Sequence, residues 1–560
     1  SFPQNMKPLG GIRLKGRADG TLANLKLVSD VWTRQGAVVI QAIFRSDTTF
    51  QHLGAKGNMM TQNFNLQPFT NPSIGRISAQ ADFDYRQDGT AKIALKAKGQ
   101  VHSIQYEKAS YRNIRFAADY NPSTISGWVN ANMTQGKLVA DFKMIQGKTP
   151  EYELRGNVTD LDLNSFYKYE KWKNPHLSVN LDAAIKGSLE QGFAGNIQLE
   201  NMQFEDGNVR FSPGLIRLEA GETSQGKNFM ELTSSFLNAR IDGKLNLGTL
   251  PGEVQNIVHK YLPQFILPVK TKSPGKNDFE FALQTKDTKQ IEQIFGSPVS
   301  LTQALAASGS INTASKHIVI RAKAPLLKYG PADVKESFFN FSNENERMSL
   351  EAHARYFNQD NRMEFDMNAN SESDTIRSQI NFSNETPDLT VGGQLDSYTF
   401  FTRNARKELV THLNLEPSMV YVNDLRFLLN PASIVNEESR TSISNLGMKV
   451  EGKNYLNING IVSNDNQDTL RVDFTNAKLS SLLTAFSIHG IDATLNGVVN
   501  IASATKSPQV FTDQFLMKNI VMNGDSIGSL DLSSKWRGDV NAMDIDAHIL
   551  RNEVRLADAS

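Results

Sequence analysis

Apolar and polar side chains alternate along most of this chain, and residues 176–186 give the clearest case. A period of two residues is that of a β-strand with one face turned away from water. The pattern returns down the chain between turns of Gly, Asn, Asp and Pro. The sequence therefore predicts a very large sheet with one apolar face. In residues 176–186 that face is formed by Leu177, Val179, Leu181, Ala183 and Ile185.

The same alternation recurs from one end of the chain to the other. Its phase sometimes slips by one residue, for example between Ile197/Leu199 and Met202/Phe204. Such a slip predicts a bulge or turn that returns the apolar side chains to their own face. The further alternating segments are Ile93/Leu95/Ala97, Ile318/Ile320/Ala322/Ala324, Met348/Leu350/Ala352/Ala354/Tyr356, Met363/Phe365/Met367/Ala369, Leu456/Ile458, Leu470/Val472/Phe474, Ile491/Ala493/Leu495/Gly497/Val499/Ile501 and Met543/Ile545/Ala547/Ile549.

Length, charge and cysteine content limit the classes of protein that fit this pattern. A chain of 560 residues exceeds one ordinary core, so several domains or a repetitive architecture is expected. The 59 basic and 59 acidic residues cancel, which argues against nucleic acid as the main partner because nucleic acid requires a basic surface. Cysteine is absent, which excludes disulfides, thiolate metal sites and cysteine nucleophiles and is compatible with the bacterial periplasm.

Helical patterns are few and short. Apolar residues at helical spacing predict a helix over residues 250–262, closed by Pro263, and a two-turn helix over 287–295. A further short helix is predicted over 301–307. Polar runs at 271–277 and 436–444 are interpreted as exposed loops.

A weak internal repeat accompanies these segments. A Leu-x-x-(Leu/Phe) helix start follows a strand at Leu66, Leu163 and Leu479, with similar points near Leu283 and Leu395. Imprecise periods of this size indicate duplicated units stacked in a row. We predict one continuous repetitive sheet over 1–560, with units at 1–160, 161–280, 281–394, 395–478 and 479–560.

The sequence contains no group of residues typical of an enzyme. No two of the 9 histidines have the three- or four-residue spacing that lets two imidazoles share a metal on a helix. Nucleophile-elbow and phosphate-binding glycine motifs are also absent. Asp544 and Asp546 share a strand face, where carboxylates keep the outer side of a sheet wet. We therefore expect no catalytic residue, no metal and no cofactor.

The apolar faces outnumber the helices that could cover them, and a sheet has to bury its apolar face against something. The sheet either folds onto another sheet, as in a sandwich or solenoid with a dry core, or curls into a trough that holds an apolar ligand. The trough also explains the shortage of covering helices and the neutral exterior. We predict an all-β fold: an elongated, curled antiparallel sheet (a β-taco) with an apolar groove, built from weak repeats with few short helices.

No stretch has the roughly 18 to 20 uninterrupted apolar residues that span a bilayer. The chain starts at Ser1 without a signal peptide. We therefore expect a piece of a longer protein whose membrane anchor lies outside it.

Two segments resemble the repeating unit of the TamB family of AsmA-like proteins. The first is residues 161–166 followed by the strands 177–187 and 195–199. The second is residues 477–497 with Ser507-Pro508 and residues 519–521 after it. The resemblance covers most of the chain diffusely and rests on pattern and spacing. The Asn- and Lys-rich texture is closer to a Bacteroidetes member.

The resemblance implies a periplasmic protein anchored to the inner membrane, whose rolled sheet belongs to the bridge-like lipid transfer superfamily. It implies phospholipid as the cargo between the inner and outer membranes, and an Omp85-type outer-membrane barrel as the partner of regions outside this chain. The leading hypothesis is passive conduction of phospholipid, in which acyl chains lie on inward-facing side chains and head groups stay in water. The predicted groove-lining residues are Ile93, Leu95, Leu177, Val179, Leu181, Ile185, Ile318, Ile320, Leu350, Met363, Phe365, Met367, Leu456, Ile458, Val472, Phe474, Ile491, Leu495, Val499, Met543 and Ile545.

Other functions fit the same pattern. The same residues could form an ordinary dry core. The alternative function is a scaffold for translocation and assembly of outer-membrane proteins, whose strand edges pair with nascent barrel strands. A third class is an extracellular adhesin solenoid.

Overall fold

The structure, a computed structural model, describes residues 4–21, 23–49, 51–89, 92–107, 109–188, 192–270, 277–286, 288–301, 303–358, 361–386, 389–423, 425–484, 490–506, 508–537, 542–551 and 554–559. The chain forms two compact units. The first unit comprises residues 1–248 and 281–302, and the second comprises residues 249–280 and 303–560. The strand β17 (Asp278–Thr285) is divided between them.

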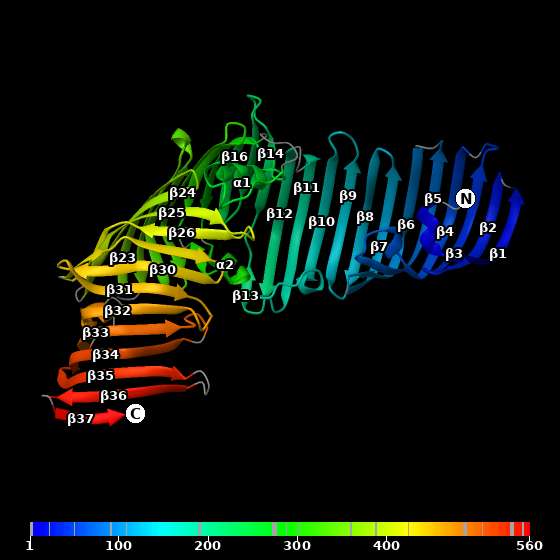
Figure 1. Cartoon of the computed structure of the whole chain (residues 1–560). Helices are drawn as coiled ribbons and strands as arrows, with labels where there is room; N and C mark the ends of the chain where they lie inside the picture. Colours follow the sequence, from blue (N-terminus) through cyan, green and yellow to red (C-terminus); the bar gives the residue numbers. More distant parts are fainter. Residues whose placement is uncertain are drawn as a thin grey trace. The chain divides into compact units, whose positions relative to one another are not determined.

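The first unit is an antiparallel sheet in which each strand from β1 to β12 pairs with the next strand along the chain (Figure 1). β12 pairs with both β13 and β14, and the sheet continues through β15 to β16. The strands are β1 (Arg13–Thr21), β2 (Asn24–Thr33), β3 (Gly36–Ser46), β4 (His52–Asn65), β5 (Ile74–Asp88), β6 (Lys92–Tyr106), β7 (Ala109–Asn121), β8 (Thr124–Met133), β9 (Gly136–Ile145), β10 (Glu151–Asp162), β11 (Pro175–Ser188), β12 (Gly192–Asp206), β13 (Val209–Phe211), β14 (Ile216–Glu222), β15 (Asn228–Thr233), β16 (Leu237–Lys244) and β18 (Val299–Leu301).

Short helices lie along one rim of this sheet. Antiparallel strands alternate in direction, so the connections that follow even-numbered strands from β2 to β12 lie at the same rim. η2 and η3 are in such connections, and the Leu9 carbonyl of η1 accepts a hydrogen bond from Arg34 N in the β2–β3 turn. α2 packs on β13 and, through Trp172 Nε1 to the Ile294 carbonyl, on the β10–β11 connection. We call this the helix-bearing rim; its helices are η1 (Gln4–Leu9), η2 (Gln67–Phe69), η3 (Leu163–Ser165) and α2 (Lys289–Phe295).

The second unit is also an antiparallel sheet, and it divides and rejoins. β19 to β25 pair in chain order, β25 pairs with both β26 and β27, and these two branches meet again at β30. From β30 to β37 each strand again pairs with its chain neighbour. The elements are α1 (Leu250–Tyr261), β19 (Ala306–Asn312), β20 (His317–Tyr329), β21 (Ala332–Ser342), η4 (Glu344–Glu346), β22 (Met348–Asn358), β23 (Asn361–Glu372), β24 (Thr375–Thr386), β25 (Leu389–Arg403), β26 (Leu409–Leu415), β27 (Ser418–Val422), β28 (Leu425–Leu429), β29 (Ala432–Glu437), β30 (Arg440–Val450), β31 (Lys453–Val462), β32 (Thr469–Lys478), α3 (Leu479–Thr484), β33 (Ile491–Ala502), β34 (Gln509–Met522), β35 (Asp525–Arg537), β36 (Ala542–Arg551) and β37 (Val554–Ala559).

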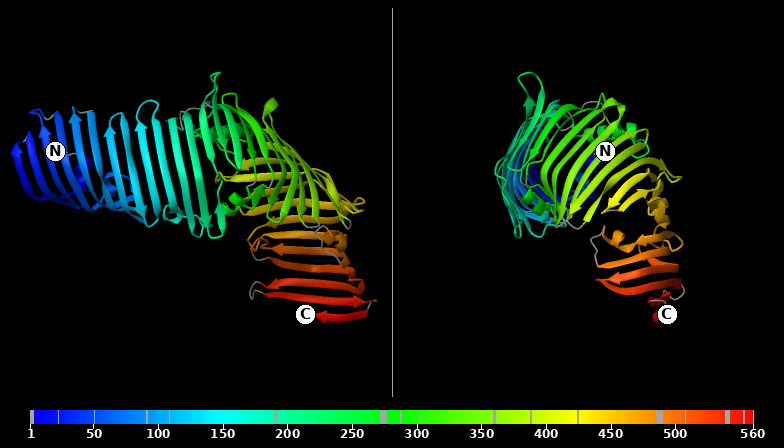
Figure 2. Two further views of the ribbon diagram at one scale, coloured as in Figure 1. Left: turned by 180° about the vertical axis from the view of Figure 1, so that it is seen from behind. Right: turned by 90° about the vertical axis from the view of Figure 1, so that its left-hand side faces the viewer.

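Bulges bend the long strands of both units. Asn63 in β4 and Asn476 in β32 have φ of 48° and lie where the pairing register shifts. The N–H of Asn63 donates to Ser78 Oγ at 3.0 Å, and that of Asn476 donates to Asn496 Oδ1 at 2.9 Å. Asn tolerates this left-handed conformation better than most residues, and a bulge bends the strand that contains it. In the right-hand view of Figure 2, the teal strands of the first unit bow into a curved wall.

The predicted all-β antiparallel fold with few short helices is confirmed. The predicted phase slip before Met202 is a bulge, with Asn201 at φ 51°. The predicted helices at 250–262 and 287–295 correspond to α1 and α2. The single groove over 1–560 and its repeat boundaries stay predictions.

Three local predictions were wrong. The helix expected over 301–307 is not formed: Ala306 and Ala307 belong to β19 and pair with Lys323 and Ala322, because strand pairing outweighs their helix propensity. The helix start near Leu395 is the middle of β25. Of the two polar runs expected as exposed loops, residues 436–444 differ from the prediction. Residues 436–444 form a tight hairpin of β29 and β30. Residues 271–276 lie outside the described residues, and Asn277 is 0% exposed.

Candidate functional site

The apolar side chains of the first unit form continuous rows across the strands. Residues that are directly opposite in an antiparallel pair project to the same face, so the register shows which side chains are neighbours. One row, from β2 to β15, is Leu27, Ala42, Gly57, Phe83, Ala97, Ala118, Gly127, Phe142, Leu154, Ala183, Ile197, Leu218 and Leu232.

Adjacent rows on the same face are apolar too. We call the face that these rows form the apolar face of the first unit. A second row is Phe44, Ala55, Tyr85, Leu95, Tyr120, Ile125, Met144, Tyr152, Ile185, Gly195, Ala220, Met230 and Ile241. A third row is Ile40, Met59, Ala81, Gly99, Phe116, Val129, Ala140, Gly156, Leu181, Leu199 and Ile216.

This apolar face is open to solvent over much of its area. Met59, Tyr152 and Leu154 are 37%, 38% and 36% exposed, although each has an apolar neighbour on both sides in its row. The helices of the helix-bearing rim contact the strands β5, β11, β13 and β18, and among the described residues of this unit no second layer of strands packs on the rows. The face is nonetheless the less exposed of the two: Val101 on it is 9% exposed, whereas Val139 on the opposite face is 46% exposed. The apolar face is therefore the inner side of the curl.

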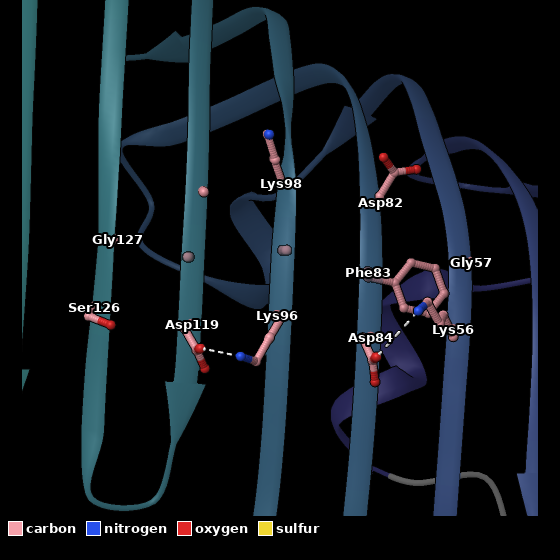
Figure 3. Close-up of a pocket in the computed structure, with 13 residues that line it drawn as sticks. Lys56, Gly57, Asp82, Phe83, Asp84, Lys96, Lys98, Asp119, Ser126 and Gly127 are labelled. Atoms are coloured by element: carbon pink, nitrogen blue, oxygen red, sulfur yellow. Dashed lines mark ion pairs between the residues drawn. The ribbon is translucent and has the colours of Figure 1, made fainter.

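The outer face of the same strands has charges of alternating sign. Lys56, Asp84, Lys96 and Asp119 are successive cross-strand neighbours, and the Lys96 Nζ to Asp119 Oδ2 distance is 2.9 Å (Figure 3). Hydrogen bonds from the Arg86 guanidinium hold the pKa of Asp84 below its usual value. A depression of about 680 Å³ lies over these residues, but charged side chains surround it. These charged side chains keep the outer face hydrated.

Most predicted groove residues of the first unit lie on the apolar face. Leu95 and Ile185 are in the second row, and Leu181 is in the third. Val179 opposes Val158 in a further row, and Ile93 opposes Gln87 near the strand end. Leu177 is different, because it packs in a cluster with the buried Phe204, Phe211 and Ile294 at the helix-bearing rim.

The second unit places its predicted residues in three environments. Half-buried residues in apolar rows are Ile320, Leu350, Met363, Met367, Ile491 and Val499. Residues that solvent reaches are Phe365, Met543 and Ile545, which are 38%, 39% and 40% exposed. Ile318 is 2% exposed, and the remaining residues pack in or against a closed cluster: Leu456, Ile458, Val472, Phe474 and Leu495.

That cluster is a dry core between the sheet and a helix. Its buried members are Val422, Phe427, Tyr455, Leu456, Ala477, Ala493 and Leu495. Leu479 and Leu482 of α3 pack against it, so α3 covers the apolar face at this position. A groove here would be filled by the protein's own side chains.

Much of the open face is formed by residues that were not predicted from the sequence. Phe83, Phe142 and Leu154 belong to it as fully as the predicted residues do. Each lies in an alternating segment, but the row emerges only from the cross-strand register, which a single sequence does not give.

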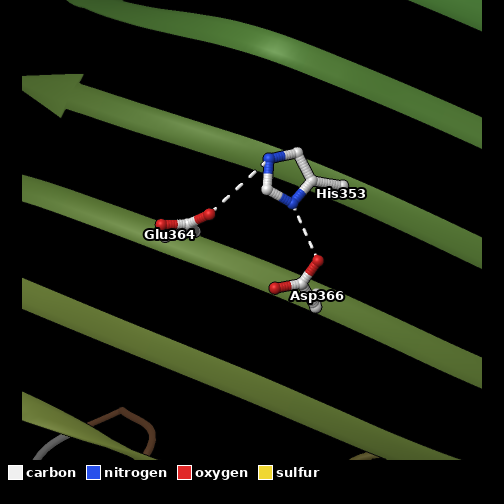
Figure 4. A group of neighbouring side chains, drawn as sticks. All are labelled: His353, Glu364 and Asp366. Carbon is white, nitrogen blue, oxygen red and sulfur yellow. Dashed lines mark hydrogen bonds and ion pairs between the residues drawn. The ribbon is translucent and has the colours of Figure 1, made fainter.

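The one group of possible metal ligands among the described residues is on a polar face of the second unit (Figure 4). His353 Nδ1 lies 2.8 Å from Asp366 Oδ1, and its Nε2 lies 3.9 Å from Glu364 Oε1. Arg355 Nε is 3.4 Å from the same Glu364 oxygen. The histidine spacing along the chain gave no sign of this group. Because Arg355 already supplies a cation to Glu364, the geometry is that of an ion-pair network.

Within the described residues, no helix has the length and apolar character needed to cross a membrane. None of the protein-family models compared with the chain matches it. Among curated proteins, none is significantly similar to it in sequence.

Proposed function

We propose that this chain carries phospholipid, with acyl chains lying on the apolar face of the first unit and head groups in water at its rims. The observation that supports the proposal is the set of apolar rows, which run without a charged side chain from strand to strand and stay accessible at Met59, Tyr152 and Leu154. Neighbouring strands are ~4.8 Å apart, so an acyl chain that follows a row contacts several strands.

An acyl tail should bind to the apolar face without being held strongly at any one position. Burial of one methylene is worth about 0.8 kcal/mol, so an acyl tail gains several kcal/mol on such a wall. The rows repeat similar side chains from strand to strand, so successive positions have similar energies and a tail can slide along them. The outer charges, such as the Lys96–Asp119 pair, keep the other face hydrated.

The proposal extends to the cellular role that the resemblance to the TamB family implies. In that role the chain is part of a periplasmic bridge, anchored to the inner membrane outside this chain, that passes phospholipid toward the outer membrane. No enzymatic step is involved, and an Omp85-type barrel is the partner at the outer membrane.

The test compares lipid content between variants of the two faces. Leu154→Asp places a carboxylate on the inner face of β10, and Val139→Asp places one on the outer face of the adjacent β9. Both positions are at least one-third exposed, so both variants are expected to fold. Mass spectrometry of co-purifying lipids should show phospholipid in the wild-type chain and the Val139→Asp variant, and a several-fold loss in Leu154→Asp. Equal lipid content in the two variants would contradict the proposal.

The scaffold alternative has one feature in its favour. Every residue of β1 is exposed, and β2 is its only strand partner among the described residues. Photocrosslinkers at Leu154 and on β1 separate the two functions in cells. Labelling of phospholipid from Leu154 favours conduction, whereas labelling of outer-membrane proteins from β1 favours the scaffold.

A further inference from the structure

A loop on the helix-bearing rim is rich in aromatic and basic residues. It connects η3 to β11 and reads Phe-Tyr-Lys-Tyr-Glu-Lys-Trp-Lys over residues 166–173. We call it the aromatic–lysine loop. Phe166 and Tyr167 are 41% and 66% exposed, and the neighbouring Phe295 at the end of α2 is 50% exposed. Tyr167, Tyr169, Trp172 and Phe295 form a contiguous group, since Tyr169 and Trp172 each lie 6.4 Å from Phe295 between ring centroids and Tyr167 lies 6.5 Å from Trp172. The Phe166 ring stacks on Tyr111 of β7 instead, with 5.0 Å between the centroids.

Hydrogen bonds to the backbone of residues 294–296 hold the loop in place. Tyr169 Oη donates to the Phe295 carbonyl at 3.0 Å, Lys171 Nζ to the Gly296 carbonyl at 2.7 Å, and Trp172 Nε1 to the Ile294 carbonyl at 3.0 Å. The Trp172 ring also packs 5.5 Å from the buried Phe204 ring. Because the support is preformed, the exposed rings do not have to be ordered when a partner binds.

The charge of the loop differs from that of the chain. Residues 166–173 contain Lys168, Lys171 and Lys173 against Glu170, which gives 3 − 1 = +2, whereas the chain as a whole has a net charge of 0. Lys168 and Lys173 are exposed. The nearby acid Asp206 is turned to the backbone, where it accepts hydrogen bonds from the N–H groups of Lys173 and Asn174.

We propose that the aromatic–lysine loop, with Phe295, docks the first unit on the surface of an anionic lipid bilayer. Tyr and Trp prefer the level of the head groups, where their rings are in an apolar environment and their polar atoms are wet. Lysine side chains reach from such a position to the phosphates of anionic lipids. The inference goes beyond lipid carriage and does not depend on it, because the loop could bind a bilayer whether or not the apolar face holds lipid.

Vesicle flotation tests the proposal with the 560-residue chain. The wild-type chain should float with vesicles of phosphatidylglycerol and phosphatidylcholine, bind phosphatidylcholine vesicles less, and lose affinity as salt is raised. Lys168→Glu should weaken binding to the anionic vesicles by about fivefold or more, since a lysine near such a surface contributes about 1 kcal/mol. Tyr167→Ser should also weaken binding. Both side chains are exposed, so neither change should affect folding.

The matched control is Tyr329→Ser, which removes a 57% exposed ring of β20 far along the chain from the loop. It should leave vesicle binding unchanged, and far-UV circular dichroism should be the same for all variants. Failure of the wild-type chain to float with anionic vesicles would overturn the proposal, as would an equal loss in Tyr329→Ser. A dimer that Tyr167→Ser abolishes, without vesicle binding, would assign the loop to a second copy of the chain. Leu154→Asp should bind vesicles normally, which separates this test from that of lipid carriage.

Discussion

Leu154 in the first unit and Leu495 in the second have the same backbone setting but different surroundings. Each lies in a long antiparallel strand, on its apolar face, between apolar cross-strand neighbours: Phe142 and Ala183 for Leu154, Ala477 and Met517 for Leu495. Leu154 is 36% exposed and Leu495 is 4% exposed. Leu495 is buried because the short helix α3 packs on the cluster that contains it. In the described part of the first unit, no helix packs on the rows around Leu154.

α3 is fixed by a small polar network. The Tyr455 hydroxyl accepts a hydrogen bond from Lys478 N at 2.7 Å and donates one to the Lys478 carbonyl at 3.0 Å. Burial raises the pKa of the Tyr455 phenol above its usual value. Asp492 Oδ1 accepts from Ser480 N at 3.1 Å, at the start of the helix. Strand periodicity thus determines which side chains share a face, whereas a few residues outside the strands decide whether that face is a core or an open surface.

The largest effect that the comparison predicts is on stability. Leu495→Asp places a carboxylate in the closed cluster, where an unpaired charge should lower the free energy of unfolding by about 4 kcal/mol or more. Leu154→Asp should cost less than about 1.5 kcal/mol, because water reaches that side chain. Urea unfolding followed by far-UV circular dichroism measures both. Losses of the same size in the two variants would mean that the face around Leu154 is also a dry core.

A smaller change should convert the closed region into an open one. Leu482→Ser removes an apolar contact between α3 and the cluster, at a cost of about 2 kcal/mol. The loosened helix should expose Leu456 and its neighbours, so binding of an apolar fluorescent dye should rise. Leu483→Ser is the matched control, because Leu483 is half-buried in the same helix and is outside the cluster. Equal dye binding in the two variants would show that α3 does not act as the cover.

The sequence predicted the strands, their apolar face and one of their bulges, because these depend on periods of two that are visible along the chain. It did not distinguish Leu456 or Leu495 from Leu181, since all three have the same alternating context. The cover over the first two comes from α3, whose sequence resembles that of several other short segments. The false helix at 301–307 has the reverse cause: Ala306 and Ala307 favour a helix locally, but pairing with β20 requires a strand.

The open face itself was predicted only in part. Alternation identified Leu95 and Leu181, yet the rows that connect them to Phe83, Phe142 and Leu154 depend on register. Register depends in turn on turn lengths and bulges along the sheet. The aromatic–lysine loop was visible in the sequence as a run of Tyr, Lys and Trp, but its exposure follows from the support given by residues 294–296, which are distant in the chain.

The smallest predicted loss of stability is at the bulges, which bend strands in both units. Asn63 and Asn476 both have φ of 48°, a conformation in which a β-branched side chain costs about 1–2 kcal/mol. Asn63→Val and Asn476→Val should therefore each destabilise the chain by that amount, whereas Asn63→Gly and Asn476→Gly should be close to neutral because Gly adopts positive φ without steric cost. The same urea titrations measure all of these variants. If the Gly variants lose as much stability as the Val variants, the Asn side chains and not the backbone conformation hold the bulges. If the Val variant loses stability in only one unit, the two sheets are bent by different means. The two units would then differ in the curvature of the apolar face as well as in whether a helix covers it.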